Sequence, residues 1–247
     1  LRYHPQVVEN RYMPQIPTKH WGTVYAGGVP WHFSETPERM FEPPYPGDHN
    51  DEVRADVARE LAAASATSDG DACGQVSRAT LDPNATPERP LQGFLVVDLS
   101  QGRAGPHASM LMADAGARVV KVEPPEGDAL RRQGPPHIGD DAAAFVLLNR
   151  GKEGIVIDPE SADDRRILDA LIARADVVIE DWHSEFSRAL AYDYEALRRV
   201  NPRALCLSVT AWGERGPWVD RPQTELTAQF AAEVPLSLGR FSRSEEH

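Results

Sequence analysis

The chain has 247 residues, with 26 Lys or Arg against 38 Asp or Glu, and its formal net charge is −12. A hydrophobic content of 41% excludes a disordered chain, and no run approaches the ~20 apolar residues that a membrane span needs. The acidic balance argues against broad binding to nucleic acid or anionic lipid.

The two cysteines, Cys73 and Cys206, lie far apart in the sequence, which fits neither a disulfide framework nor a metal cluster. A reducing compartment is therefore expected, and since no charged-then-apolar leader follows Leu1, no signal peptide is expected. We predict a cytoplasmic protein that has neither nucleic acid nor a membrane among its partners.

Proline is concentrated at the start of the chain, where residues 1–90 hold eleven of the 21 prolines. Because proline fixes φ and lacks an amide donor, only short strands are predicted there, at 22–26 and 29–33. Val53, Val57 and Leu61 are spaced for one apolar helix face, which predicts a helix over 52–64 with Asn50 or Asp51 as N-cap. Residues 66–90 have the composition of a linker, and a surface loop of that length within one domain is uncommon.

From residue 91 onward, apolar strands alternate with helices. Strands are predicted at 94–99, 118–123, 155–158, 176–180 and 204–209, and helices at 108–115, 161–175 and 194–200. Ser161 and Asp164 have the spacing of an N-terminal cap. The alternation predicts an α/β fold, a Rossmann-like doubly wound parallel sheet over residues 91–247.

Ligands of such sheets bind at the carboxyl ends of strands, near helix N-termini. After the first strand come Gly102, Arg103 and Gly105, whose G-x-x-G spacing differs from the G-x-G-x-x-G of dinucleotide-binding proteins. Their amides and charge suit an anion, although the two glycines can equally serve only the turn.

Two further polar groups suit a phosphate-bearing nucleotide. Asn149, Arg150 and Lys152 place two cations around a glycine before the third strand, where a solvated turn is the alternative. Asp181 and Trp182 follow the fourth strand, and the indole could stack on a base or belong to the core. The eight histidines show no metal-ligand spacing and there is no G-x-S-x-G, so neither a metal nor a serine nucleophile is predicted.

Together, these segments resemble the family III CoA-transferases (the CaiB/BaiF type), a group that also contains α-methylacyl-CoA racemases. GARVVKVEPPEGD at 116–128 matches the family's G-A-x-V-I-K-V-E-x-P-x-G-D, and LNRGK at 148–152 matches its L-N-R-x-K. PLQGFLVVDLS at 90–100, AGP at 104–106 and the segments at 176–182, 194–197, 201–203 and 213–217 follow in the family's order. The resemblance covers residues 90–232.

Residues 1–65 resemble the other end of the same family. GVPWHFS at 28–34, the Thr-Pro at 36–37 and PGDH at 46–49 are similar to the family's closing segments. This order predicts the junction of two tandem copies: residues 1–65 end the first, residues 66–90 link them, and residues 91–247 begin the second. We expect few contacts between 1–65 and 91–247 within one chain; a circularly permuted single copy is the alternative.

The resemblance implies coenzyme A and acyl-CoA as substrates, with no tightly bound cofactor. In the family an Asp carboxylate attacks the thioester, an aspartyl-CoA thioester forms through an anhydride, and an acceptor carboxylate then takes the CoA. The segment that carries this Asp lies beyond residue 247, so no catalytic residue is expected in this chain. The family also implies an interlocked homodimer, or pairing with the other copy in the same polypeptide.

By position, the resemblance implies CoA contacts on four segments of the chain. The residues are Gln101, Arg103 and Ala104 beside the pantetheine, Lys152 with Asn149 and Arg150 at the phosphates, and Asp181 and Trp182 at the nucleotide. Arg103 and Lys152 are expected to line one CoA-binding cleft.

Two family positions depart from the pattern. Ala189 stands where an arginine is expected, and Thr224-Glu225 replaces the Tyr-Asp of the transferases and the His-Asp of the racemases. A CoA-transferase is therefore the leading hypothesis. A non-catalytic CoA-binding half and a racemase are the alternatives, and a generic dinucleotide-binding domain ranks after them.

Overall fold

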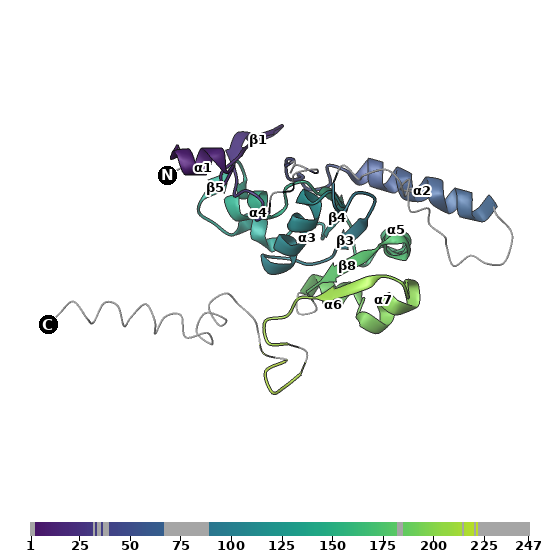
Figure 1. The fold of residues 1–247 in the computed structure, drawn as a ribbon. Helices are drawn as coiled ribbons and strands as arrows, with labels where there is room; N and C mark the ends of the chain where they lie inside the picture. Colours follow the sequence, from purple (N-terminus) through teal and green to yellow (C-terminus); the bar gives the residue numbers. More distant parts are fainter. Residues whose placement is uncertain are drawn as a thin grey trace. The chain divides into compact units, whose positions relative to one another are not determined.

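The computed structural model describes residues 3–31, 33, 36, 40–66, 89–181, 185–213, 215–219 and 221, in two compact units, 1–208 and 209–247. The elements of the first unit are shown in Figure 1. In chain order they are α1 (Pro5–Glu9), β1 (Gln15–Thr18), β2 (Gly22–Tyr25), α2 (Asn50–Ala66), β3 (Leu95–Asp98), α3 (Ala104–Asp114), β4 (Arg118–Glu123), the 3-10 helix η1 (Ala129–Arg132), β5 (His137–Ile138), β6 (Asp141–Ala142), α4 (Ala143–Leu148), β7 (Glu153–Val156), α5 (Ala162–Arg174), β8 (Val177–Glu180), α6 (Glu185–Leu190), α7 (Tyr194–Val200) and β9 (Leu205–Ser208).

The main sheet has five parallel strands in the order β7-β4-β3-β8-β9. The chain moves outward from β3 through β4 to β7, then crosses over to β8 and continues to β9. The direction of winding therefore reverses between β3 and β8, where doubly wound sheets bind ligands. The predicted Rossmann-like fold is confirmed.

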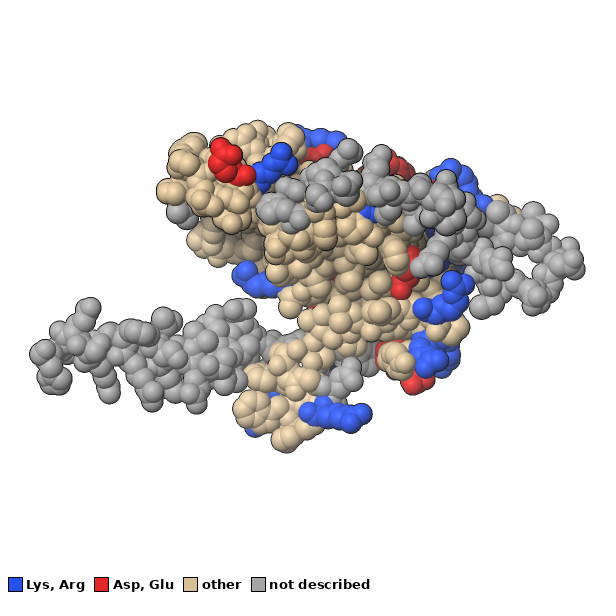
Figure 2. All heavy atoms as spheres, viewed as in Figure 1, with Lys and Arg blue, Asp and Glu red and all other residues tan. Residues whose placement is uncertain are grey.

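The outer surface carries scattered charge. On the face that Figure 2 shows, the described Lys and Arg side chains form separate small groups rather than one continuous basic patch. Among the described helices, none combines the length and apolar character that crossing a membrane requires.

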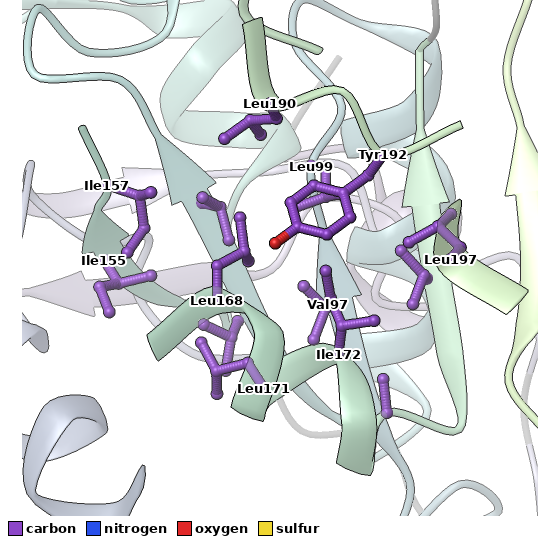
Figure 3. Packing of buried hydrophobic residues seen from close by; sticks show 14 of the residues in the cluster. Val97, Leu99, Ile155, Ile157, Leu168, Leu171, Ile172, Leu190, Tyr192 and Leu197 are labelled. Atoms are coloured by element: carbon purple, nitrogen blue, oxygen red, sulfur yellow. The ribbon is translucent and has the colours of Figure 1, made fainter. Parts of the chain in front are cut away.

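The two faces of the sheet differ in chemistry because successive side chains of a strand alternate between them. One face is apolar and packs on Leu168, Leu171 and Ile172 of α5 (Figure 3). Its residues in the strands, or directly after β3 for Leu99, are Val97, Leu99, Val120, Val122, Ile155 and Val178. The opposite face, contacted by α3, carries three fully buried charges, Asp98, Lys121 and Glu123.

Several elements lie where the periodicity places them. The bounds of β4 and α7 equal the predicted ones, and Ser161 caps α5 by accepting a hydrogen bond from the Asp164 amide at 3.3 Å. Helix α3 begins at Ala104, four residues earlier than predicted, because Pro106 lies in the first turn, where no amide donor is needed. Strand β7 begins two residues early, at Glu153, where pairing with Val120 starts.

Several short elements were not predicted from the sequence. Helices α1, α4 and α6, the 3-10 helix, strand β1 and the β5–β6 hairpin span at most six residues each, too few for a clear periodicity. The predicted strand at 29–33 is wrong for Val29–Trp31, which form no strand, and position 32 lies outside the described residues. Most of the predicted linker, residues 67–88, also lies outside them.

The expectation of few contacts between residues 1–65 and 91–247 is wrong. Val53 and Val57 of α2 are 0% and 1% exposed and belong to the same apolar cluster as the sheet. Arg54 pairs with Asp164 of α5 at 2.8 Å, 110 positions along the chain. Helix α2 therefore completes the core because its apolar face fits the sheet and α5, a match that no local pattern reveals.

The segment around the start of α2 also covers the open edge of the sheet. Strand β7 is an edge strand, and its outward-facing backbone groups belong to Gly154 and Val156. Gly154 exchanges two hydrogen bonds of 3.1 Å with His49, one to the ring Nδ1 and one from its amide. The Val156 amide donates to Asn50 Oδ1 at 2.8 Å, and its carbonyl accepts from Arg54 at 3.0 Å. Asn50 is thus an edge cap rather than the predicted N-cap, and strand addition at this edge is blocked.

The second unit holds a small aromatic group among its described residues. Trp212 and Trp218 meet edge to face with their ring centroids 5.2 Å apart, and the Arg221 guanidinium lies 4.5 Å from the Trp218 ring. Thr224 and Glu225 lie outside the described residues.

Candidate functional site

The loop of residues 100–103 joins β3 to α3 at the point where the sheet reverses its winding. Gly102 has φ +74°, which an L side chain rarely adopts, and nothing lies within 4 Å of an added Cβ. At Gly105 an added Cβ would lie 2.2 Å from Ser100 Oγ, so glycine lets α3 approach the end of β3. These geometries favour the turn and packing roles of the two glycines.

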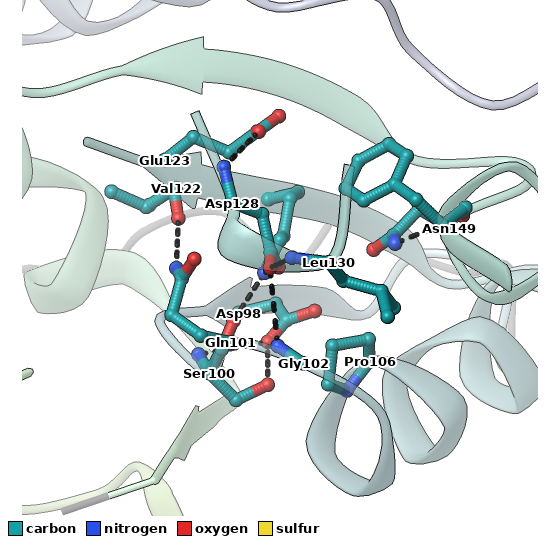
Figure 4. A network of polar contacts seen from close by, with 12 residues as sticks. Asp98, Ser100, Gln101, Gly102, Pro106, Val122, Glu123, Asp128, Leu130 and Asn149 are labelled. Atoms are coloured by element: carbon teal, nitrogen blue, oxygen red, sulfur yellow. Dashed lines mark hydrogen bonds and ion pairs between the residues drawn. The ribbon is translucent and has the colours of Figure 1, made fainter. Parts of the chain in front are cut away.

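Two amides of this loop already donate to carboxylates, and Figure 4 shows the pair formed by Gly102 and Asp128. The Gln101 amide donates to Asp181 Oδ2 at 2.8 Å, and the Gly102 amide donates to Asp128 Oδ1 at 3.2 Å. An anion at these two amides would meet carboxylates, so they do not form the anion site that the glycines suggested. The loop is instead anchored to Asp181, directly after β8, and to Asp128, the N-cap residue of η1.

A buried ion pair lies beneath the loop. Lys121 Nζ lies 3.0 Å from Asp128 Oδ2, with both side chains 0% exposed, and it also donates to the carbonyl of Ser100. Burial by itself would lower the pKa of Lys121, but the neighbouring carboxylates, Asp128 foremost, raise it above its usual value. The ammonium therefore stays charged in the interior.

Asp98 is the centre of a second buried group. One oxygen accepts from the amide and hydroxyl of Ser100, and the other accepts from the Ser109 hydroxyl and from Lys152 Nζ at 3.0 Å. Burial alone would raise the pKa of Asp98, but the ammonium groups of Lys152 and Lys121 and the two hydroxyls lower it to about 2. Burial lowers the pKa of Lys152 to about 8, against the opposing effect of Asp98. The cluster thus ties the first turn of α3 to β3 and to the start of β7.

The predicted phosphate-contacting residues lie inside the protein. Lys152 donates to Asp98, to the Pro106 carbonyl at 2.9 Å and to Asn149 Oδ1 at 2.7 Å, which uses all three of its donors. Asn149 is 0% exposed and donates to the carbonyl of Phe145. Arg150 is 3% exposed and pairs with Asp114 at 2.7 Å. Lys152 and Arg150 thus contact α3, through the Pro106 carbonyl and Asp114.

Three of the other predicted residues lie at the surface, at the loop and the start of α3. Gln101 is partly exposed, and Arg103 and Ala104 at the start of α3 are exposed. Within the described part of the chain, no hydrogen bond or ion pair of the Arg103 side chain is found. Asp181 is 9% exposed and also accepts from the Ser187 hydroxyl at 2.7 Å, while Trp182 lies outside the described residues.

Arg103 and Lys152 both lie at the N-terminal end of α3. Arg103 is the N-cap residue of α3, and Lys152 Nζ bonds the Pro106 carbonyl in the first turn of that helix. A pocket of about 350 Å³ is lined by Lys152 together with Lys19, Phe41 and other residues of the N-terminal segment and β7, and Arg103 is not among its lining residues. The shared cleft that the sequence suggested for these two cations stays a prediction.

The charged residues of the motif at 116–128 received no role from the sequence. Glu123 receives two hydrogen bonds of 2.7 Å from Arg131, whose guanidinium also lies 3.7 Å from the Phe145 ring centroid and pairs with Asp141. The available signal was the pair of charges Lys121 and Glu123, two positions apart and separated by an apolar residue, at the end of a strand whose middle is apolar. That pattern places charges on one buried face, where each needs a partner.

Within the described ranges, no group of three or more His, Cys, Asp or Glu residues is arranged to hold a metal ion. The charged clusters here are instead carboxylates paired with Lys and Arg. In the Lys121–Asp128 and Lys152–Asp98 groups the carboxylates pair with ammonium groups and hold the structure around the loop of residues 100–103.

Comparison with known proteins gives a consistent result. The chain is 35% identical over 156 residues to the acetyl-CoA:oxalate CoA-transferase of Acetobacter aceti, covering 63% of this chain and 40% of that protein. It is 40% identical over 145 residues to the succinate–glutarate CoA-transferase of Agrobacterium fabrum, covering 56% of this chain and 36% of that protein. The crystal structure of a CAIB/BAIF family protein from Brucella suis matches with a TM-score of 0.54 and 37% identity, over 59% of this chain and 39% of that one.

The chain thus spans about two fifths of the length of these relatives. The profile of CoA-transferase family III matches residues 91–240, more than half of the chain. With the parallel sheet and the ordered motifs already described, this match shows that the chain belongs to CoA-transferase family III.

Proposed function

We propose that this chain is part of an enzyme that moves coenzyme A between an acyl-CoA thioester and a carboxylic acid. Family membership supports this proposal, as do the relatives, which are named as CoA-transferases acting with oxalate or glutarate. The nucleophilic Asp, which would form the anhydride and the aspartyl-CoA thioester, lies outside this chain in the proposal.

The observation that carries the proposal is the anchored loop at the reversal point of the sheet. Its backbone is held by Asp128 and Asp181, while Arg103 keeps an exposed guanidinium at the start of α3. A guanidinium pairs with phosphate oxygens through two parallel hydrogen bonds. We assign direct CoA contacts to Gln101, Arg103 and Ala104.

The other predicted residues divide by burial. Trp182 remains a proposed nucleotide contact. Asn149, Arg150 and Lys152 are buried and satisfied, as is Asp181, and in the proposal they support the site from beneath rather than touch the phosphates.

We further propose that the chain spans the junction of two tandem copies, with residues 1–65 closing the first copy, residues 66–90 linking them and residues 91–247 opening the second. The packing of α2 against the sheet supports a domain formed by the end of one copy and the beginning of the next. The chain covers two fifths of its relatives, which agrees with a partial copy. Pairing with a second chain, or with the other copy of the same polypeptide, would supply the missing part.

The test is to express the complete reading frame and measure CoA exchange between an acyl-CoA and a carboxylic acid. Hydroxylamine should trap the acyl-enzyme as a hydroxamate on an Asp outside residues 1–247. A full-length protein that neither exchanges CoA nor yields the hydroxamate contradicts the proposal.

The second candidate is a non-catalytic CoA-binding half. It is favoured by Ala189, which stands where the family has an arginine and whose carbonyl accepts a hydrogen bond from Arg165 at 2.8 Å. This candidate would be supported if this copy binds CoA and if Arg103→Ala leaves the rate of CoA exchange by the full-length protein unchanged. A racemase is a weaker alternative because Thr224-Glu225 offers no histidine base.

A further inference from the structure

We propose that Asp128 is a positioning residue for the candidate CoA site, and that the Arg131–Glu123 pair behind it links the N-terminal segment to the loop of residues 100–103. This inference rests on the proposed function. It assigns to Asp128 a role distinct from ligand contact: the carboxylate is fully buried and sets the path of the loop that carries Arg103.

Asp128 and Lys121 hold backbone groups of the loop on either side of Gln101. The Asp128 carboxylate accepts from the Gly102 amide at 3.2 Å, and Lys121 donates to the Ser100 carbonyl. Since the two side chains are themselves paired at 3.0 Å, the position of one fixes the position of the other. The loop is thereby held on both sides of Gln101, directly before the exposed Arg103 (Figure 4).

A series of hydrogen bonds leads from the backbone of Asp128 to the N-terminal segment. The Asp128 amide donates to Glu123 Oε2 at 2.9 Å, and the same oxygen accepts from Arg131 Nε at 2.7 Å. Arg131 in turn donates through Nη2 to the carbonyl of Pro44 at 3.1 Å. Pro44 precedes α2, so the segment that caps the sheet edge also holds the guanidinium that orients Glu123 and, through it, Asp128.

The energetic cost of this arrangement supports a positioning role. Moving a carboxylate and an ammonium out of water is expensive, and a buried ion pair is often no more stabilising than apolar residues of the same size. An apolar pair at these positions would leave the Ser100 carbonyl and the Gly102 amide without these partners. The ion pair therefore specifies one loop conformation, and a site that is organised before ligand binding binds more tightly.

The experiment compares two aspartates that each accept a backbone amide at opposite ends of β3. Asp128→Ala removes the acceptor of the Gly102 amide at the carboxyl end, together with the acceptor of the Leu130 amide and the partner of Lys121. Asp176→Ala is the matched control, because Asp176 Oδ2 accepts the Leu95 amide at 2.9 Å at the amino end. Asp128→Asn keeps an oxygen acceptor and serves as the conservative variant that tolerates folding better.

For each chain, CoA binding is measured by calorimetry, and hydrogen exchange is measured at the Gln101 and Gly102 amides. We expect Asp128→Ala to weaken CoA binding about tenfold or more and to increase exchange at both amides, with Asp128→Asn intermediate. Asp176→Ala should lower the melting temperature while CoA affinity stays within about twofold of the wild type. Asp128→Asn alone decides the outcome if Asp128→Ala does not fold.

Unchanged CoA affinity in the Asp128 variants, or equal losses in the Asp128 and Asp176 variants, would overturn the inference while leaving the proposed function intact. A wild-type chain that binds no CoA contradicts the proposed function instead, and the exchange measurement then still decides whether Asp128 fixes the loop. Wild-type exchange at Gln101 and Gly102 in the Asp128 variants overturns the inference in either case.

Discussion

At the scale of single residues, Asp98 and Lys152 are charged side chains that are buried with their hydrogen-bonding groups paired. Both are almost fully buried, and each remains hydrogen-bonded because groups from β3, α3 and the start of β7 converge on them. In the sequence, Lys152 together with Asn149 and Arg150 suggested a phosphate site. At this scale the functional assignment depends on whether the donors are already occupied.

The lowered pKa of Asp98 predicts acid sensitivity. Its folded-state value of about 2 lies below the ordinary 3.8, so the ionised form stabilises the fold above about pH 4. This stabilisation is lost as the pH falls from about 4 to about 2, and it amounts to about 2 kcal/mol of unfolding free energy. Urea unfolding of the wild type and Asp98→Asn across this range checks it: the difference between the two should shrink toward acid. A constant difference contradicts the prediction.

Lys152 and Arg103 should separate stability from ligand binding. Lys152→Met leaves Asp98 buried beside one fewer cation, so the unfolding free energy should fall by about 3 kcal/mol or more. Arg103→Ala touches an exposed side chain and should leave the unfolding free energy within about 0.5 kcal/mol of the wild type. In CoA titrations, the loss of CoA affinity relative to the loss of unfolding free energy should be larger for Arg103→Ala than for Lys152→Met. The opposite result, with the larger relative loss of CoA affinity in Lys152→Met, would support a direct contact between Lys152 and the CoA phosphates.

At the scale of elements, the edge of the sheet is closed by side chains and backbone rather than by another strand. His49, Asn50 and Arg54 satisfy the outward groups of Gly154 and Val156 on β7. Local patterning correctly indicates that 52–64 is helical. It does not indicate that the residues just before this stretch pair with a strand about a hundred positions away.

The edge cap predicts a local effect of Asn50→Ala. Losing the acceptor of the Val156 amide should lower the unfolding free energy by about 1 kcal/mol and speed hydrogen exchange at that amide. Asn10→Ala is the control, because the Asn10 side chain donates to the carbonyl of Gln6 in the exposed helix α1. Equal protection of Val156 in the wild type and Asn50→Ala would show that the cap does not hold the edge.

At the scale of the whole molecule, one apolar cluster joins α2, the five-stranded sheet, α5 and α7. Residues on both sides of the 67–88 segment therefore share a core, and the N-terminal part and the sheet should unfold in one step within the first unit. This contradicts the independence that the tail-then-head order of the family motifs suggested. The reason is that the apolar side chains of α2 are buried only against the sheet and α5.

Val57→Ala tests that cooperativity. Removing the two methyl groups of a side chain that is 1% exposed should lower the unfolding free energy by about 2 kcal/mol. Hydrogen exchange under mildly destabilising conditions should accelerate equally in α2 and in β3. Leu61→Ala is the control, because Leu61 is 51% exposed on the same helix and should leave both rates unchanged. Faster exchange in α2 alone would show two independent cooperative units.

The order of local patterns was enough to predict much of this protein. Apolar strands alternating with amphipathic helices predicted the doubly wound parallel sheet, because strand and helix periods are properties of neighbouring residues. The ordered motifs between residues 90 and 232 predicted the family, which the match to residues 91–240 shows.

Only the tertiary structure shows which polar residues are buried and already paired. Lys152 and Arg150 look like ligand-binding cations in sequence, yet they are buried against Asp98 and Asp114. Lys121 and Asp128 look like motif residues without a role, yet they hold the loop at the reversal point. Burial and pairing depend on partners brought together from distant positions, and the spacing along one chain segment carries no information about those partners.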